Sequence, residues 1–324
     1  MIVLWGLPGD GPLAAVYNVL QKWGAPVMFL DQRDVLQTEI EVCFGSHISG
    51  SIRAKDQLIE LEKITAVYLR PYDSRKLPLV ARAGPDSDIW QHALAVDELL
   101  TSWSEVTPAL VVNRPEAMAT NCSKPYQATV IKSFGFEIPP TLITTDPEAA
   151  LEFWRHYGTV IYKSVSDVRS IVSRLTVEQA ARLEKVTCCP TQFQQYIPGD
   201  DYRVHVVGEE VFACQILSEA DDYRYASQQG KCTSLQACEL PEEVDLRCRA
   251  LTSSLHLLVA GIDLRRTPDG TWYCFEVNPS PGFTYFQKGT HQAIDEAIAR
   301  LLHALPALPC SSATKPISSN RLTA

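Results

Sequence analysis

Three side chains near the end of the sequence have the types and the spacing of a cation site. Asp263 lies in one apolar run and Glu276 in the next, and the Pro-Asp-Gly sequence at residues 268–270 between them is typical of a hairpin turn. With the Asp and the Gly as central turn residues, Asp263 pairs directly with Glu276 across two antiparallel strands. Asn278 then lies on the same face.

Two carboxylates that face each other on neighbouring strands repel unless a cation lies between them. Oxygen atoms of Asp, Glu and Asn are the ligands that Mg²⁺ prefers, with its other positions left for water and phosphate. We therefore predict a metal site at Asp263, Glu276 and Asn278. The alternative is a solvated sheet face with incidental acids, because a one-residue error in the turn would separate the pair.

Two lysines and a strand connector are candidates for contact with a nucleotide. Lys163 ends a short apolar strand, so rigid backbone aims its ammonium group, and Lys124 lies in the first turn of a predicted helix. A lysine alone is more often solvated surface charge. The connector after the strand 192–197 leaves backbone donors and acceptors that suit an adenine edge, although an ordinary loop fits as well.

The elements that must position these residues change in kind along the chain. Residues 1–110 alternate strands and helices, including a helix candidate at 54–62, and are typical of α/β structure. Residues 111–190 predict a small α+β unit, and residues 191–305 are richer in antiparallel strands. We expect domain boundaries at these points and a disordered tail over 306–324.

Composition excludes several classes of protein. The chain has 324 residues, 46% of them hydrophobic, and a net charge of −9, so a surface that tracks nucleic-acid phosphates is not expected. No run approaches the ~20 apolar residues of a membrane span, and no secretory signal is evident. We expect a cytoplasmic protein whose ten cysteines are mostly reduced, with no membrane or nucleic-acid partner.

In order along the chain, these motifs resemble the ATP-grasp superfamily, in particular the RimK-like carboxylate–amine ligases and the related graspetide, or microviridin-type, macrocycle ligases. Residues 275–283 (F-E-V-N-P-S-P-G-F) are similar to the metal-binding strand and loop of that family. Asp263 matches the preceding acidic ligand, and residues 194–203 match the hinge and its following arginine. Residues 121–124 and 161–163 match the two phosphate-binding lysine segments. The resemblance covers roughly residues 111–305 and implies an ATP-grasp fold behind a Rossmann-like N-terminal lobe.

The resemblance also implies a chemistry. ATP would lie between two α+β lobes, and a substrate carboxylate would become an acyl phosphate that an amine, or less often a hydroxyl or thiol, opens. Arg203 would be the catalytic residue that stabilises the developing charge. One or two Mg²⁺ ions, or Mn²⁺, would bind Asp263, Glu276 and Asn278. Contacts to the nucleotide would come from Lys124, Lys163, Gln194, Gln195, Tyr196, Ile197, Ser164 and Arg169.

The sequence departs from the family in two places. The loop 164–170 has no glycine, whereas many relatives cover the phosphates with a Gly-rich flap; its serines and Arg169 would have to substitute. Gln195 stands where relatives often have Glu. The acceptor, whether a small molecule, a peptide or a protein, is beyond the sequence, and a homo-oligomer is compatible with it.

Two other functions stay open. Residues 9–14 (G-D-G-P-L-A) fit the G-x-G-x-x-A pattern of dinucleotide binding, and Asp31 lies at a suitable distance for a ribose contact. An NAD(P)-dependent Rossmann oxidoreductase is therefore an alternative, although Pro12 is unusual in such a turn. A non-catalytic ATP-binding module is a third reading. Arg70, at the end of a buried strand, would meet an acidic substrate or form an ion pair, and His205 shares the face of Arg203.

Overall fold

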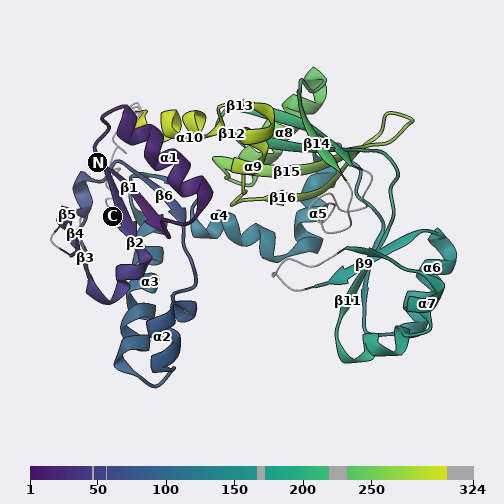
Figure 1. Cartoon of the computed structure of the whole chain (residues 1–324), viewed down its shortest axis with the longest axis horizontal. Helices are drawn as coiled ribbons and strands as arrows, with labels where there is room; N and C mark the ends of the chain where they lie inside the picture. Colours follow the sequence, from purple (N-terminus) through teal and green to yellow (C-terminus); the bar gives the residue numbers. More distant parts are fainter. Residues whose placement is uncertain (46, 56, 166–171, 219–231, 305–324) are drawn as a thin grey trace, which may run out of the picture.

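The computed structural model describes residues 1–45, 47–55, 57–165, 172–218 and 232–304. Figure 1 shows an N-terminal part at one end, a small sheet with its helices at the other end, and a large sheet between them. Together these parts have the mixed α/β content that the sequence predicts. The expected tail and most of the glycine-free loop lie outside the described residues.

The N-terminal part is built on a parallel sheet in the order β2-β1-β6-β7. Its two central strands, β1 and β6, are apolar and buried along almost their whole length, as expected where helices cover both faces. This agrees with the predicted α/β alternation; the Rossmann-like description remains a prediction. The elements are β1 (Ile2–Gly6), α1 (Gly11–Lys22), β2 (Val27–Asp31), β6 (Ala66–Arg70), α2 (Pro78–Ala83), α3 (Asp88–Val106) and β7 (Leu110–Val112).

The helix predicted over residues 54–62 is wrong. This stretch contains the end of β4 (Ile48–Ala54), the strand β5 (Gln57–Glu60) and a short 3₁₀ turn, and β3 (Thr38–Phe44) completes a separate antiparallel sheet. Ile52 and Ile59 pair across that sheet and are both buried, so tertiary packing overrides the local helical pattern.

The small middle unit is an antiparallel sheet in the order β10-β9-β11-β8, with helices on one face. Tyr162 and Phe193 pair across β9 and β11 and face a core that α6 completes. Since side chains alternate along a strand, Lys163 projects to the opposite face. The elements are β8 (Thr141–Thr144), α6 (Pro147–Tyr157), β9 (Val160–Ser164), β10 (Ser173–Arg174), α7 (Val177–Ala180) and β11 (Thr191–Gln195).

The large sheet is antiparallel in the order β14-β13-β12-β15-β16. One face packs on α5 and α8 through a buried apolar cluster, which leaves the other face for polar groups. The elements are α4 (Pro115–Ala119), α5 (Lys124–Ser133), β12 (Asp200–Val207), β13 (Glu210–Ser218), β14 (Thr233–Cys238), α8 (Glu242–Ser254), β15 (Val259–Arg266), β16 (Trp272–Asn278) and α9 (Thr284–Thr290).

The last described helix, α10 (Ile294–His303), returns to the N-terminal part and packs against α1. Its buried residues Ile294 and Ile298 belong to the same apolar cluster as Leu4 and Leu13. The two ends of the described chain therefore share one core. The domain boundaries predicted from the sequence stay a proposal.

Two further observations concern the class of protein. None of the described helices combines the length and the apolar character needed to cross a membrane. No cysteine in the described ranges forms a disulfide, and burial raises the pKa of Cys248 to about 12. The buried thiols of Cys214, Cys248 and Cys274 act as small apolar groups in the core.

Candidate active site

The predicted pairing of the two carboxylates is confirmed: Asp263 on β15 lies directly opposite Glu276 on β16. Two compensating departures from the expected hairpin produce this register. The turn centres on residues 268–269 rather than 269–270, because the Gly270 amide donates to the Thr267 carbonyl. A bulge then makes Phe275 an extra residue on β16 and restores the pairing.

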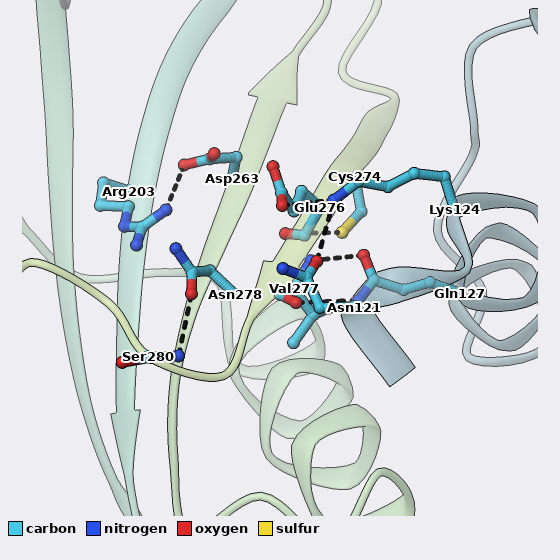
Figure 2. Close-up of polar contacts among 10 residues, drawn as sticks. All are labelled: Asn121, Lys124, Gln127, Arg203, Asp263, Cys274, Glu276, Val277, Asn278 and Ser280. Carbon is cyan, nitrogen blue, oxygen red and sulfur yellow. Dashed lines mark hydrogen bonds and ion pairs between the residues drawn. The ribbon is translucent and has the colours of Figure 1, made fainter. Parts of the chain in front are cut away.

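Arg203 extends this pair into a row of three charged residues across neighbouring strands. Arg203 on β12 lies opposite Asp263 on β15, so the sequence of charges is cation, anion, anion. Its Nη1 lies 2.6 Å from an Asp263 carboxylate oxygen, and its side chain is only 7% exposed (Figure 2). The permanent charge of the guanidinium thus neutralises one of the two opposed acids.

Lys124 neutralises the second acid from a different element. It is the first residue of α5, and its Nζ lies 2.5 Å from a Glu276 carboxylate oxygen and 2.9 Å from the Asn121 side-chain oxygen. Gln127, one turn along, holds the helix against β16: its amide donates to the Val277 carbonyl and accepts from the Val277 N–H, at 2.8 and 3.0 Å (Figure 2). Nothing in the sequence distinguishes this buried glutamine from a surface residue.

The electrostatics at Glu276 show that three predicted cations converge there. Burial acts to raise the pKa of this carboxyl, but the charges of Lys124, Lys163 and Arg203 outweigh burial and leave the pKa below its ordinary value. Glu276 is therefore ionised at neutral pH. Lys163 comes from β9 of the small sheet, so the site spans two sheets.

Asn278 is held by the loop that follows β16. Its side-chain oxygen accepts from the Ser280 N–H at 2.8 Å (Figure 2). Ser280 in turn accepts a hydrogen bond of 2.9 Å from Arg70, which also forms an ion pair with Asp10 at 2.7 Å. Of the two roles predicted for Arg70, the structure shows the ion pair and adds a contact to this loop.

Asn113, which belongs to none of the motifs in the sequence, fixes the other side of the same loop. It is 2% exposed, and its amide donates to the carbonyls of Val259 and Pro279, both at 2.6 Å. Its oxygen accepts from the amides of Leu258 and Val259. The start of β15 and the end of β16 are thus joined through one buried side chain.

These residues fit a divalent cation by their chemistry. Asp263 and Glu276 are adjacent, share one face with Asn278, and offer two carboxylates and an amide oxygen. Within the described ranges, no group of three or more His, Cys, Asp and Glu side chains gathers as a metal site. A cation at this sheet therefore depends on two acids, the amide and further oxygen ligands.

The connector from β11 to β12 joins the small sheet to the large sheet, and much of the backbone beside it is hydrogen-bonded within the protein. The amides of Gln195 and Tyr196 donate to the carbonyls of Pro140 and Thr159, and the Ile197 carbonyl accepts from Arg265 at 2.7 Å. These three backbone groups therefore already have partners within the protein, and the predicted contact of residues 194–197 with adenine stays a prediction. The Gln194 side chain donates to Thr141, and the Tyr196 ring stacks on Arg174 at 4.3 Å.

Two predicted nucleotide contacts fall outside what the structure describes. Arg169 is not among the described residues, and of Ser164 only the backbone, at the end of β9, is described. A pocket of about 230 Å³ lies nearby, lined among others by Tyr162 and Phe193. Because those two side chains project away from Lys163, the pocket is on the opposite face of the small sheet from the charged row.

The N-terminal turn differs from a dinucleotide site in one respect. Asp10 caps α1 by accepting from the Leu13 amide at 2.9 Å, and the same carboxylate pairs with Arg70. A helix N-terminus that binds a pyrophosphate must leave its amides to the ligand. Here the chain supplies its own anion, and Asp31 likewise pairs with Arg33.

Comparison with known proteins places the motif-bearing part of the chain in one group. The family model described as the RimK-like ATP-grasp domain matches residues 123–302, which is more than half of the chain. Among the curated proteins, none matches this sequence.

Several solved structures are similar to this chain over nearly its whole length. Macrocyclase MdnC from Microcystis aeruginosa MRC, bound to precursor peptide MdnA, is 24% identical with a TM-score of 0.79 over 94% of this chain and 99% of that one. A RiPP-associated ATP-grasp ligase from Chryseobacterium gregarium, in complex with ADP and a leader and core peptide, is 22% identical with a TM-score of 0.78, over 93% and 96%. The ATP-grasp ligase PsnB, complexed with a phosphomimetic variant of a minimal precursor, Mg and ADP, is 25% identical with a TM-score of 0.73, over 93% and 97%.

Proposed function

Since this chain belongs to the RimK-like ATP-grasp family, we propose that its ATP- and Mg²⁺-dependent ligase activity joins a carboxylate of a peptide to an amine, or to a hydroxyl. The observation that carries this proposal is the row Arg203–Asp263–Glu276, with Lys124 bonded to Glu276 and the charge of Lys163 acting on the same carboxyl. Three cations beside two acids suit a ligand that brings both phosphate and a divalent metal.

The residue roles follow from this arrangement. Asp263, Glu276 and Asn278 would hold Mg²⁺, which when bound neutralises charge on phosphate oxygens. Lys124 and Lys163 would bind the phosphates of ATP, the source of the phosphoryl group that activates the carboxylate. Residues 194–197 would lie beside the adenine, with Ser164 and Arg169 in the covering loop.

Arg203 would act on the reacting groups themselves. Its guanidinium is planar and permanently charged, and the sheet holds it beside Asp263 before any substrate binds. A donor fixed in this way stabilises developing negative charge without reorganisation at the moment of reaction. No nucleophile from the protein is required, so the chain's contribution is to bind, orient and neutralise charge.

A peptide substrate is supported by the relatives. MdnC, the Chryseobacterium gregarium ligase and PsnB were each solved with a precursor, leader or core peptide, and each matches over 93% or more of this chain. A peptide that carries both an acidic and an amine or hydroxyl side chain would be closed into a ring. Each bond formed this way removes one water from the peptide.

The test is a screen for ADP release in the presence of Mg²⁺, with free amino acids, small acids and peptides encoded beside the gene as substrates. We expect ADP only with a peptide, and a product lighter by one water for each new bond. Glu276→Ala should abolish both ADP release and the lighter product. Glu62→Ala changes an exposed acid in the N-terminal part and should abolish neither. Turnover of free amino acids alone would contradict the peptide proposal. An unfolding temperature that NAD(H) raises and ATP does not would favour the oxidoreductase.

A further inference from the structure

His205 is a buried titratable residue that the proposed chemistry does not use. It lies on β12 two residues after Arg203, so the two side chains share one face of the large sheet, as the sequence predicts. His205 is 1% exposed. Its Nε2 lies 3.5 Å from Nε of Arg203, which donates to it at the long end of the hydrogen-bond range.

Arg203 is enclosed on the sides that do not face Asp263. The Phe286 ring of α9 lies 5.7 Å from the guanidinium carbon and 5.2 Å from the centre of the His205 ring. Gly261 on β15 leaves room for the end of the guanidinium, because a Cβ at that position would lie 2.1 Å from Nη2 of Arg203. The imidazole, the phenyl ring and the bare glycine backbone together surround the base of the guanidinium.

The hydrogen bond also fixes the proton on His205. An Nε2 that accepts from arginine must be unprotonated, so the neutral ring carries its proton on Nδ1. Within the described part of the chain, Nδ1 is buried and has no hydrogen-bond partner. Burial, and then the charge of Arg203, hold the pKa of His205 well below its ordinary value, which keeps the ring neutral.

An unpaired buried N–H lowers stability, and an apolar side chain at this position would avoid it. Packing of the core therefore does not account for a histidine here. What histidine provides, and a hydrocarbon does not, is an acceptor directed at Nε of Arg203.

We infer that His205 is a positioning residue that orients the guanidinium of Arg203 toward Asp263 and the charged row. Nε is the one guanidinium nitrogen next to the side-chain stem, so an acceptor there sets the rotation of the whole group. Nη1 and Nη2 then point to Asp263 and over Gly261. The inference rests on the proposed role of Arg203 in the ligase reaction.

Kinetics of two variants test the role. His205→Leu removes the acceptor, and we expect kcat to fall by about tenfold to a hundredfold, as for other misplaced catalytic groups, while KM for ATP changes less than threefold or so. His205→Gln restores an acceptor oxygen and should recover most of kcat. Val206→Ala, a buried change on the opposite face of β12, is the matched control and should alter stability but not kcat.

A structural role would give a different pattern. In that case His205→Leu and Val206→Ala would lower activity only in proportion to unfolded protein, and His205→Gln would recover no more than His205→Leu does. That result would overturn the inference.

A spectroscopic measurement tests the contact without any turnover. In protein labelled with ¹⁵N-histidine, the resonances lost in His205→Gln identify the ring, which we expect as a neutral Nδ1–H tautomer at pH 7. Arg203→Lys should shift the Nε2 resonance. An Nε2–H tautomer, or a resonance unmoved by Arg203→Lys, would refute the contact. If no substrate is found, the proposed function fails while this measurement still decides the inference.

Discussion

Asp263 and Glu276 lie directly opposite each other, yet each is neutralised by a different cation: Arg203 pairs with the first and Lys124 with the second. The two cations come from β12 and from the start of α5. Two opposed acids are thus held together by elements far apart in the sequence, and the site depends on the relative placement of those elements.

Asp263→Asn should raise the Mg²⁺ requirement of ADP release by about tenfold or more, because the change removes a charged metal ligand and the partner of Arg203. The measurement is ADP release as a function of Mg²⁺ concentration. Asp245→Asn in α8, where the acid pairs with Arg249 away from the site, is the control. An unchanged Mg²⁺ dependence in Asp263→Asn would remove this residue from the metal site.

Gly261→Ala should disable the enzyme while leaving it folded. The new Cβ would lie 2.1 Å from Nη2 of Arg203 and 2.7 Å from Cβ of Pro281, so the guanidinium and the loop after β16 must both move. We expect turnover to fall by about a hundredfold. Gly9→Ala, whose Cβ would meet nothing within 4 Å, is the matched control. Full activity in Gly261→Ala would show that the position of Arg203 is not critical.

Gln127→Leu should destabilise the protein by about 2 to 4 kcal/mol, because it leaves the buried N–H and carbonyl of Val277 without partners. Lys124 should also lose its fixed approach to Glu276. Urea unfolding measures the stability. Gln21→Leu, at an exposed glutamine whose side chain donates to Tyr17, should change the stability by less than about 0.5 kcal/mol. Equal effects of the two changes would contradict this account of α5.

Arg70→Met should destabilise the protein by about 3 kcal/mol, as expected when one partner of a largely buried ion pair is removed. It also releases Ser280, which holds Asn278, so the Mg²⁺ requirement should rise in the same variant. Arg75→Met removes a surface pair with Asp73 and serves as the control for urea unfolding and for Mg²⁺ titration. Loss of stability with an unchanged Mg²⁺ requirement would mean that the loop does not depend on Arg70.

Stability should fall as the pH drops below 6.5, in part because of His205. The folded protein keeps this ring neutral, since its pKa lies well below 6.5, whereas the unfolded chain takes up a proton at that ordinary value. Acid therefore favours unfolding, by at most about 1.4 kcal/mol per pH unit for one such group.

Urea unfolding at pH 7.5, 6.5 and 5.5 checks this sign. His205→Leu should lose less stability between pH 6.5 and 5.5 than the wild type does, by about 1 kcal/mol. His303→Gln, at an exposed histidine, should follow the wild type. A steeper loss in His205→Leu would show that the ring is protonated in the folded state.

The site residues that could be predicted from the sequence are those that belong to short, recognisable motifs. The pairing of the acids at 263 and 276 could be predicted because turn residues and strand periodicity fix a strand register. The predicted register is correct only because the shift of the turn by one residue is compensated by the bulge at Phe275. That Lys124 and Lys163 both act on one carboxylate was expected only from the resemblance, since nothing in their spacing predicts that α5 and β9 both bring a charge to Glu276.

The residues that hold the site together were harder to predict. Gln127 and Asn113 are ordinary polar residues in the sequence, and only burial against a distant strand gives them a role. The engaged backbone of Gln195 and Tyr196 is likewise a product of the small-sheet packing. The helix predicted at residues 54–62 failed for the same reason, because partners in the sheet decided the conformation.

The packing of α10 against α1 has a consequence for how the protein is made. During synthesis α1 emerges early, but the helix that covers its apolar side is among the last described segments to leave the ribosome. Until α10 has been made, Leu13, Val16 and Leu20 have an incomplete cover, so the N-terminal part is exposed to aggregation during that time. A truncated protein that ends before residue 294 would keep every proposed catalytic residue but would lack the part of the N-terminal apolar core that α10 supplies. Domain-by-domain expression is therefore a poor route to this enzyme, and co-translational holding by a chaperone would favour its yield.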